Sequence, residues 1–155
     1  MKSQSAEAIL AEIDSTISEI NSFPHSSFIE QAYLAKFLVV FISGIYEESI
    51  ERIINDMTQR LGKNEISSFI EKSISNNFRN PNIENVKKLL SKFGNNLWID
   101  EINTLSEEIK NSFNSINSNK NALAHGTPVS ITLSDVTDYY HKSRCVIEKI
   151  DDLLL

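Results

Sequence analysis

Apolar residues recur at helical spacing along most of this chain, and this pattern constrains the fold more than any other sequence feature. Only four Gly and three Pro interrupt the 155 residues, and the segments between them favour helices. No long linker divides the chain, and its length suits one hydrophobic core. The sequence therefore predicts an all-α fold, a single-domain bundle of about five or six helices over residues 1–155.

Start and stop residues bound the expected helices. Asn82 has the position of an N-cap, and Thr132 with Asp135 resembles a capping box. Gly44 lies inside the second helix at a cost of about 1 kcal/mol in helix propensity, which a close helix crossing would explain. The expected helices cover residues 6–20, 27–61, 65–74, 82–93, 100–125 and 132–154.

Composition indicates the cellular setting. The longest apolar stretch, residues 34–46, is too short to span a bilayer, so we interpret it as part of a buried central helix. The N-terminus lacks the pattern of a signal peptide. The single cysteine, Cys145, cannot form an internal disulfide, which is typical of a reducing compartment. These observations predict a cytoplasmic protein that does not bind a membrane.

The net charge of −6 argues against general nucleic-acid binding. The charge is uneven, since residues 61–125 carry eight basic and seven acidic side chains, whereas residues 1–60 carry four basic and nine acidic ones. Any contact with a nucleic acid is therefore expected to be local. Four cations could contact an RNA backbone, and the alternative is that they form a solvated helix face; they are Arg79, Lys87, Lys88 and Lys92.

The segment 118–126 carries the strongest functional signal, because it combines a cation, an amide and an imidazole before a helix-stopping Gly. Imidazole exchanges a proton near neutral pH, and the negative end of a helix dipole favours its protonated form. His125 can therefore take the proton of a 2′-hydroxyl or protonate a leaving oxygen, while Lys120 stabilises the charge on the phosphorane. This combination predicts cleavage of a phosphodiester without a metal or another cofactor.

The spacing within this segment favours a homodimer. Asn121 and His125 are four residues apart and share one helix face. Lys120 and His125 are five residues apart, which places them more than about 100° apart on an ideal helix. One helix therefore aims them poorly at a single atom, and two copies related by a two-fold axis would bring both sets together.

The sequence of residues 120–126, Lys-Asn-Ala-Leu-Ala-His-Gly, resembles the Arg-x4–6-His motif of the HEPN superfamily, with Lys120 in the place of the Arg. Two further stretches are similar to the RiboL-PSP-HEPN branch of that superfamily. Residues 43–48 match a Gly followed by a Glu on the long helix, and by that match Glu47 is the acid of the site. Residues 80–90 match an Asn-Pro-Asn-x-Glu-Asn pattern.

The resemblance implies a dimeric helical bundle that acts as a metal-independent endoribonuclease on RNA. It implies a toxin or anti-phage defence role, with a cognate antitoxin or defence partner. His125 is then the general acid or base, Lys120 stabilises the phosphate, and Asn121 positions His125 or the phosphate. Glu47 sets the local charge. The expected products are a 2′,3′-cyclic phosphate and a 5′-hydroxyl.

The lysine at position 120 leaves a second function open. Lys keeps the charge of Arg but lacks its planar fork, so reduced activity is expected. The main alternative is a catalytically weak or inactive HEPN module that binds RNA, a nucleotide or a partner protein. A purely structural dimerisation domain is a third interpretation.

Several candidates also have a simpler structural interpretation. His125 can cap a helix, and Glu47 can solvate the end of the apolar run. Glu48 and Glu51 are expected to face solvent. Tyr46 and Tyr140 can stack a base, but core packing is the expected role of both. His25 and His141 are interpreted as structural residues.

Overall fold

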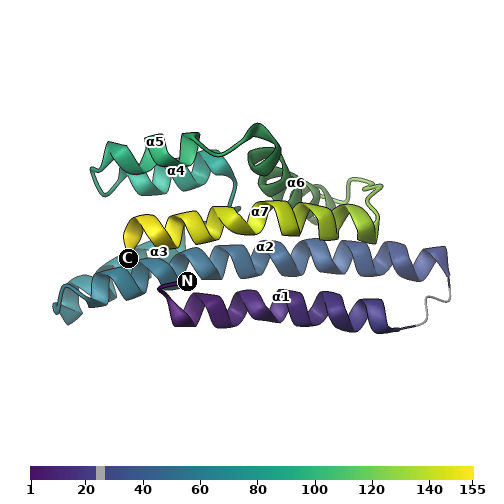
Figure 1. The fold of residues 1–155 in the computed structure, drawn as a ribbon, viewed down its shortest axis with the longest axis horizontal. Coiled ribbons are helices and arrows are strands. Elements are labelled where there is room, and N and C mark those ends of the chain that lie inside the picture. Colours follow the sequence, from purple (N-terminus) through teal and green to yellow (C-terminus); the bar gives the residue numbers. More distant parts are fainter. Residues whose placement is uncertain (24–26) are drawn as a thin grey trace.

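The computed structural model describes residues 1–23 and 27–155, which form seven helices and no strand (Figure 1). The predicted all-α class is confirmed, with more helices than expected. His25 lies outside the described residues. The helices are α1 (Gln4–Ser22), α2 (Phe28–Gln59), α3 (Asn64–Asn77), α4 (Ile83–Ser91), α5 (Asn96–Asn103), α6 (Glu107–Ala124) and α7 (Leu133–Leu154).

Helix α2 is the centre of the bundle, since it packs against α1, α3, α6 and α7. Helices α1, α2 and α7 lie side by side along the long axis, and the α4–α5 pair lies on the α7 side (Figure 1). Helical spacing gives α2 a buried stripe in which Leu38, Ile42 and Ile53 are at most 1% exposed. Burial of each such side chain stabilises the fold by about 1.5–3 kcal/mol.

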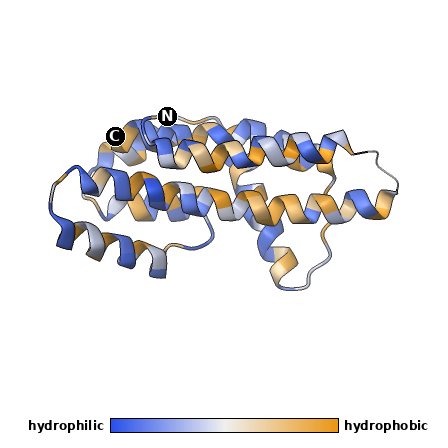
Figure 2. Ribbon diagram, turned by 90° about the horizontal axis from the view of Figure 1, so that it is seen from below, coloured by the Kyte–Doolittle hydropathy of each residue, from blue (hydrophilic) through white to orange (hydrophobic). Residues whose placement is uncertain are grey.

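Among the described helices, α2 alone is long and apolar enough to cross a membrane by length and composition. Figure 2 shows apolar residues gathered along its N-terminal half. The helix nevertheless packs against four others, and its C-terminal half supplies core residues such as Ile50 and Ile53. In this fold α2 therefore has the role of a core helix.

One expected helix is two helices in the structure. The prediction of a continuous helix over residues 100–125 is wrong, because α5 ends at Asn103 and α6 begins at Glu107. Ser106 caps α6 by accepting a hydrogen bond from the Ile109 N–H at 3.3 Å, and acidic residues occupy the first turn. The apolar stripe continues across the break, so periodicity alone does not reveal this helix start.

Two other helix starts follow their sequence signals. Asn82 caps α4 by accepting from the Asn85 N–H at 2.8 Å, and the capping box of Thr132 and Asp135 is complete. Gly44 differs from the expectation. It is exposed on α2, and a Cβ atom there would meet nothing within 4 Å, so no close helix crossing explains it.

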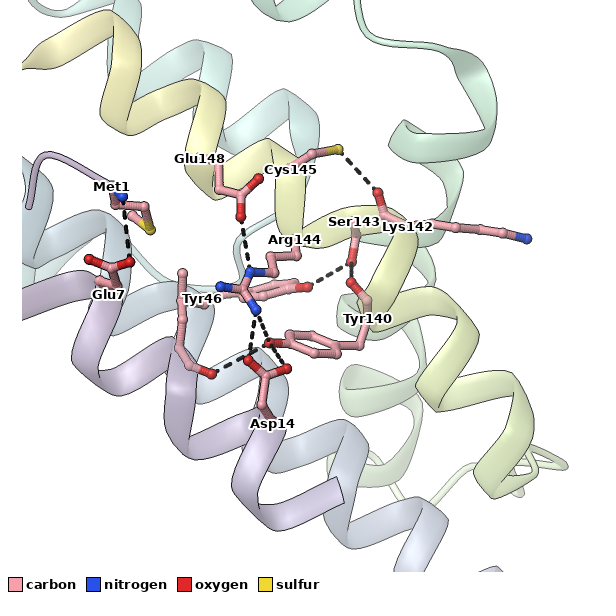
Figure 3. Close-up of polar contacts among 11 residues, drawn as sticks. Met1, Glu7, Asp14, Tyr46, Tyr140, Lys142, Ser143, Arg144, Cys145 and Glu148 are labelled. Atoms are coloured by element: carbon pink, nitrogen blue, oxygen red, sulfur yellow. Dashed lines mark hydrogen bonds and ion pairs between the residues drawn. The ribbon is translucent and has the colours of Figure 1, made fainter. Parts of the chain in front are cut away.

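A partly buried polar network joins α1, α2 and α7 (Figure 3). The Tyr46 hydroxyl bonds to Ser143 Oγ at 2.7 Å. The Tyr140 hydroxyl donates to Asp14 Oδ1 at 2.8 Å, and Arg144 Nη1 pairs with Asp14 Oδ2 at 2.7 Å. Burial raises the pKa of both tyrosines, so both hydroxyls stay protonated. Both rings are fully buried, so both tyrosines pack in the core and neither ring is available to stack a base.

Candidate functional site

The C-terminal end of α6 presents the imidazole of His125. A Schellman motif ends the helix: the Thr127 N–H donates to Ala122 O at 2.8 Å, and the Gly126 N–H donates to Leu123 O at 3.1 Å. Gly126 supplies the left-handed backbone, with φ 70°, that this motif requires. The His125 side chain is exposed and forms no hydrogen bond with another described residue. The local sequence therefore ends the helix and leaves the imidazole open to a ligand.

Lys120 lies in a polar cluster built from three parts of the chain. Its Nζ donates to Asn80 Oδ1 at 2.7 Å, which links α6 to the α3–α4 loop. The Asn80 N–H donates to Glu47 Oε2 on α2 at 3.3 Å, and Arg79 Nη1 pairs with Glu47 Oε1 at 2.5 Å. We call Glu47, Arg79, Asn80 and Lys120 the Asn80 cluster.

Asn80 has a left-handed backbone, with φ 57°, and the loop around it stabilises that conformation. Asn is one of the few non-Gly residues that adopts this conformation readily. The Asn85 side chain donates from Nδ2 to Asn80 O at 2.9 Å, and Asn114 Oδ1 on α6 accepts from the Ile83 N–H at 2.9 Å. The Asn-Pro-Asn stretch therefore fixes the Asn80 side chain against Lys120.

Glu51 does not face solvent, so that expectation is wrong. It lies one turn after Glu47, and its Oε2 accepts from Ser75 Oγ on α3 at 3.1 Å. Its Oε1 is buried and has no hydrogen-bond partner in the described chain. Burial is the main cause that raises the pKa of the Glu51 carboxyl. Glu48 is exposed as expected and pairs with Arg52.

The structure joins two of the four residues that the sequence analysis selected. Glu47 and Lys120 are linked through Asn80. The half-buried Asn121 side chain forms no hydrogen bond with the described residues, and only its carbonyl accepts from the His125 N–H, at 3.0 Å. Within one chain, the imidazole and the Asn80 cluster therefore remain separate groups.

Sequence reasoning missed Asn80 and Arg79 as members of the site. The signal was present for Asn80, because the Asn-Pro-Asn stretch was matched to the family pattern, but it was assigned to a loop. Arg79 carried no signal beyond its charge. A long-range contact such as Arg79 with Glu47 depends on how the α3–α4 loop returns to α2, which periodicity does not specify.

The ammonium of Lys120 has hydrogen-bonding capacity left for a ligand. A lysine side chain carries three N–H donors, and the bond to Asn80 uses one of them. The side chain is only partly exposed, so part of its stem is packed. Such a group suits a phosphate oxygen as a point charge.

Metal ligation has no structural support in the described part of the chain, where no group of three His, Cys, Asp or Glu side chains lies close enough to hold an ion. His141 is exposed on α7 beside the Tyr140 ring, with 5.4 Å between ring centroids. It lies on a different helix from the motif of α6.

Sequence comparison identifies the family. The model of the RiboL-PSP-HEPN family matches residues 2–155, so the chain belongs to this family. The match includes the Asn80 cluster and the end of α6, and it confirms the resemblance read from the motifs. The chain is thus a HEPN domain, in a class of nuclease and RNA-binding modules. No curated protein and no solved structure matches the chain significantly.

Two substitutions of Asn80 separate the effect of its left-handed backbone from the effect of its side-chain bond to Lys120. Asn80→Gly keeps the left-handed backbone and removes only the side chain, whereas Asn80→Ala also places a Cβ in a disfavoured conformation. We expect Asn80→Ala to lower the free energy of unfolding by about 1 kcal/mol more than Asn80→Gly does, measured by urea denaturation. Equal losses would contradict the left-handed conformation.

Glu51→Gln tests the buried carboxylate through its pH dependence. Because the folded-state pKa of Glu51 is raised, the charged form destabilises the fold once the pH exceeds the unfolded-state pKa. We expect Glu51→Gln to raise the melting temperature at neutral pH, and this gain to disappear at about pH 4, where the carboxyl is protonated in the folded protein. Glu48→Gln is the matched control on an exposed residue, and an equal gain there would refute the explanation.

Proposed function

We propose that this chain is a metal-independent endoribonuclease whose reacting groups are His125 and Lys120. The observation that carries the proposal is the bond from Lys120 Nζ to Asn80, which fixes a cation on α6, the helix whose C-terminal end presents the exposed imidazole. The family supports the same chemistry, since the chain is a HEPN domain of a nuclease and RNA-binding class.

The proposed reaction is attack by a 2′-hydroxyl on the adjacent phosphorus. The new bond joins the 2′-oxygen to phosphorus, and the bond from phosphorus to the 5′-oxygen breaks. One proton leaves the 2′-hydroxyl and one proton is added to the 5′-oxygen; His125 carries out one of these transfers, as general base or general acid, and solvent water carries out the other. The free donors of Lys120 bind the phosphorane oxygens, where negative charge develops. The products are a 2′,3′-cyclic phosphate and a 5′-hydroxyl.

Asn121 and Glu47 have supporting roles in this proposal. Asn121 lies one turn before His125 on the same face, from which its amide can position the imidazole or the phosphate. Glu47 is 18% exposed and is neutralised by Arg79, so it fixes the loop that holds Asn80 and does not repel the substrate.

A homodimer completes the proposed site. An apolar stripe remains exposed on α2, and we define this α2 stripe as Tyr33, Phe37, Val40 and Gly44. Its side chains other than Gly44 are between 48% and 67% exposed, and the stripe shares the helix face of Glu47. Exposed apolar patches of this kind mark association surfaces. In the proposed homodimer a second copy covers this stripe, and its α6 end is proposed to lie beside the first copy's Asn80 cluster.

The proposed biological role is that of a toxin or an anti-phage defence protein in the cytoplasm, controlled by a cognate antitoxin or defence partner. Family membership supports the nuclease activity on which this role depends, since the HEPN class includes nucleases. The partner is a protein that keeps the nuclease inactive until RNA cleavage is required.

The second candidate function is a binding module without cleavage, and Lys120 is the observation that favours it. Arg grips a phosphate with two parallel hydrogen bonds, whereas Lys offers a flexible point charge. In that case the Asn80 cluster binds an RNA phosphate but does not stabilise the phosphorane well enough for turnover.

Cleavage of RNA in EDTA tests the proposal. We expect the wild-type protein to cut RNA, His125→Ala to lose about 100-fold or more in rate, and Lys120→Arg to be faster than wild type. His141→Ala is the matched control, since His141 is an exposed histidine on another helix. End-group analysis should find the cyclic phosphate.

Two results would overturn the nuclease proposal. Cleavage that survives His125→Ala would assign the activity to other groups. RNA binding without cleavage by both the wild type and Lys120→Arg would favour the binding module.

A further inference from the structure

A groove lies between α3 and α4, beside the Asn80 cluster. Its volume is about 570 Å³, the size of an ordinary ligand pocket. Its floor is apolar and partly aromatic, and it consists of Phe69, Ile70, Ile74, Phe78, Leu89 and Phe93. Phe69 is 71% exposed, although a solvent-facing position does not need an aromatic ring. The groove therefore offers an apolar surface to a ligand.

The charged residues that line this groove are all cationic. Arg79, Lys88 and Lys92 line it, and no acidic side chain does. Lys88 lies on α4 and Lys92 is the C-cap residue of that helix, one turn later, and we call these two lysines the α4 pair. Both are exposed, and neither forms an ion pair with a described residue. In a chain with a net charge of −6, this concentration of unpaired positive charge is local. It complements an anionic ligand.

Two residues connect the groove to the Asn80 cluster. Arg79 lines the groove and pairs with Glu47. Asn85 also lines it and donates to Asn80 O at 2.9 Å, while the Asn80 side chain accepts from Lys120. The groove is therefore linked through Asn85 and Asn80 to Lys120, the side chain proposed to bind the scissile phosphate.

We propose that this groove binds the single-stranded RNA next to the scissile phosphate, an inference that rests on the proposed endoribonuclease function. Proteins bind single strands by stacking bases on aromatic side chains and by pairing phosphates with cations. Phe69 and Phe93 supply aromatic surface, and Lys88 with Lys92 supplies the cations along one side. A duplex keeps its bases stacked and does not fit an apolar floor of this size.

Binding of an uncleavable RNA separates this inference from catalysis. The probe is a short, fluorescein-labelled, single-stranded 2′-O-methyl oligoribonucleotide, which lacks the attacking hydroxyl, and anisotropy reports its dissociation constant. We expect Lys88→Glu with Lys92→Glu to weaken binding about tenfold or more, and to lower the slope of log affinity against log salt by about 1.4. Phe69→Ala should weaken binding about fivefold or more at unchanged salt slope.

A matched control keeps the test specific. Lys63→Glu with Lys72→Glu makes the same charge change at two exposed lysines that do not line the groove. We expect this pair to weaken binding much less than the pair on α4. Circular dichroism and the melting temperature should match wild type for all three variants, because every substituted side chain is exposed.

The outcomes separate the groove from the reaction. Groove-dependent RNA binding by a protein that does not cleave supports the groove and overturns only the nuclease proposal. Unchanged RNA affinity in the α4 pair, or equal loss in the control pair, overturns the groove and leaves the nuclease proposal intact. Tighter binding of a duplex than of the single strand also overturns it. If none of the groove substitutions changes RNA affinity, the apolar floor of the groove would be assigned to a protein ligand.

Discussion

The hydrogen bond from Lys120 to Asn80 connects the three parts of the chain on which the candidate site depends. It joins α6 to the α3–α4 loop, and the same loop residue bonds to Glu47 on α2. Asn80 has a left-handed backbone, and its side chain accepts the bond from Lys120. Without this bond, Lys120 would be a flexible surface lysine. The link from Lys120 through Asn80 and Asn85 to the groove would then be absent.

Periodicity and capping residues predicted most of the fold, because helices are local structures. The buried stripes, the Asn82 cap and the Thr132 capping box follow directly from the order of residues. The break before α6 was missed, since the cap at Ser106 competes with an apolar stripe that continues past it. The expectation that Glu51 faces solvent failed because α3 covers that turn of α2. This covering is a tertiary contact, which the local sequence does not reveal.

The candidate site was predictable only in part, for the same reason. The motif of α6 and Glu47 are visible in the sequence, but the residues that link them are not. Arg79 and Asn80 act through a loop whose path depends on hydrogen bonds from Asn85 and Asn114. Lys120 and His125 are five residues apart, which on an ideal helix places them on different faces, and this spacing is why the proposed site includes a second copy.

The most direct test of this account is the cleavage rate of two inactive variants mixed in equal amounts. His125→Ala lacks the proton-transfer group, and Lys120→Ala lacks the phosphate cation. If two copies share the reacting groups, a mixed dimer contains one intact set of both, so the mixture should cut RNA in EDTA although neither variant does alone. A mixture as inactive as its components, in a preparation shown to form mixed dimers, would contradict the shared site.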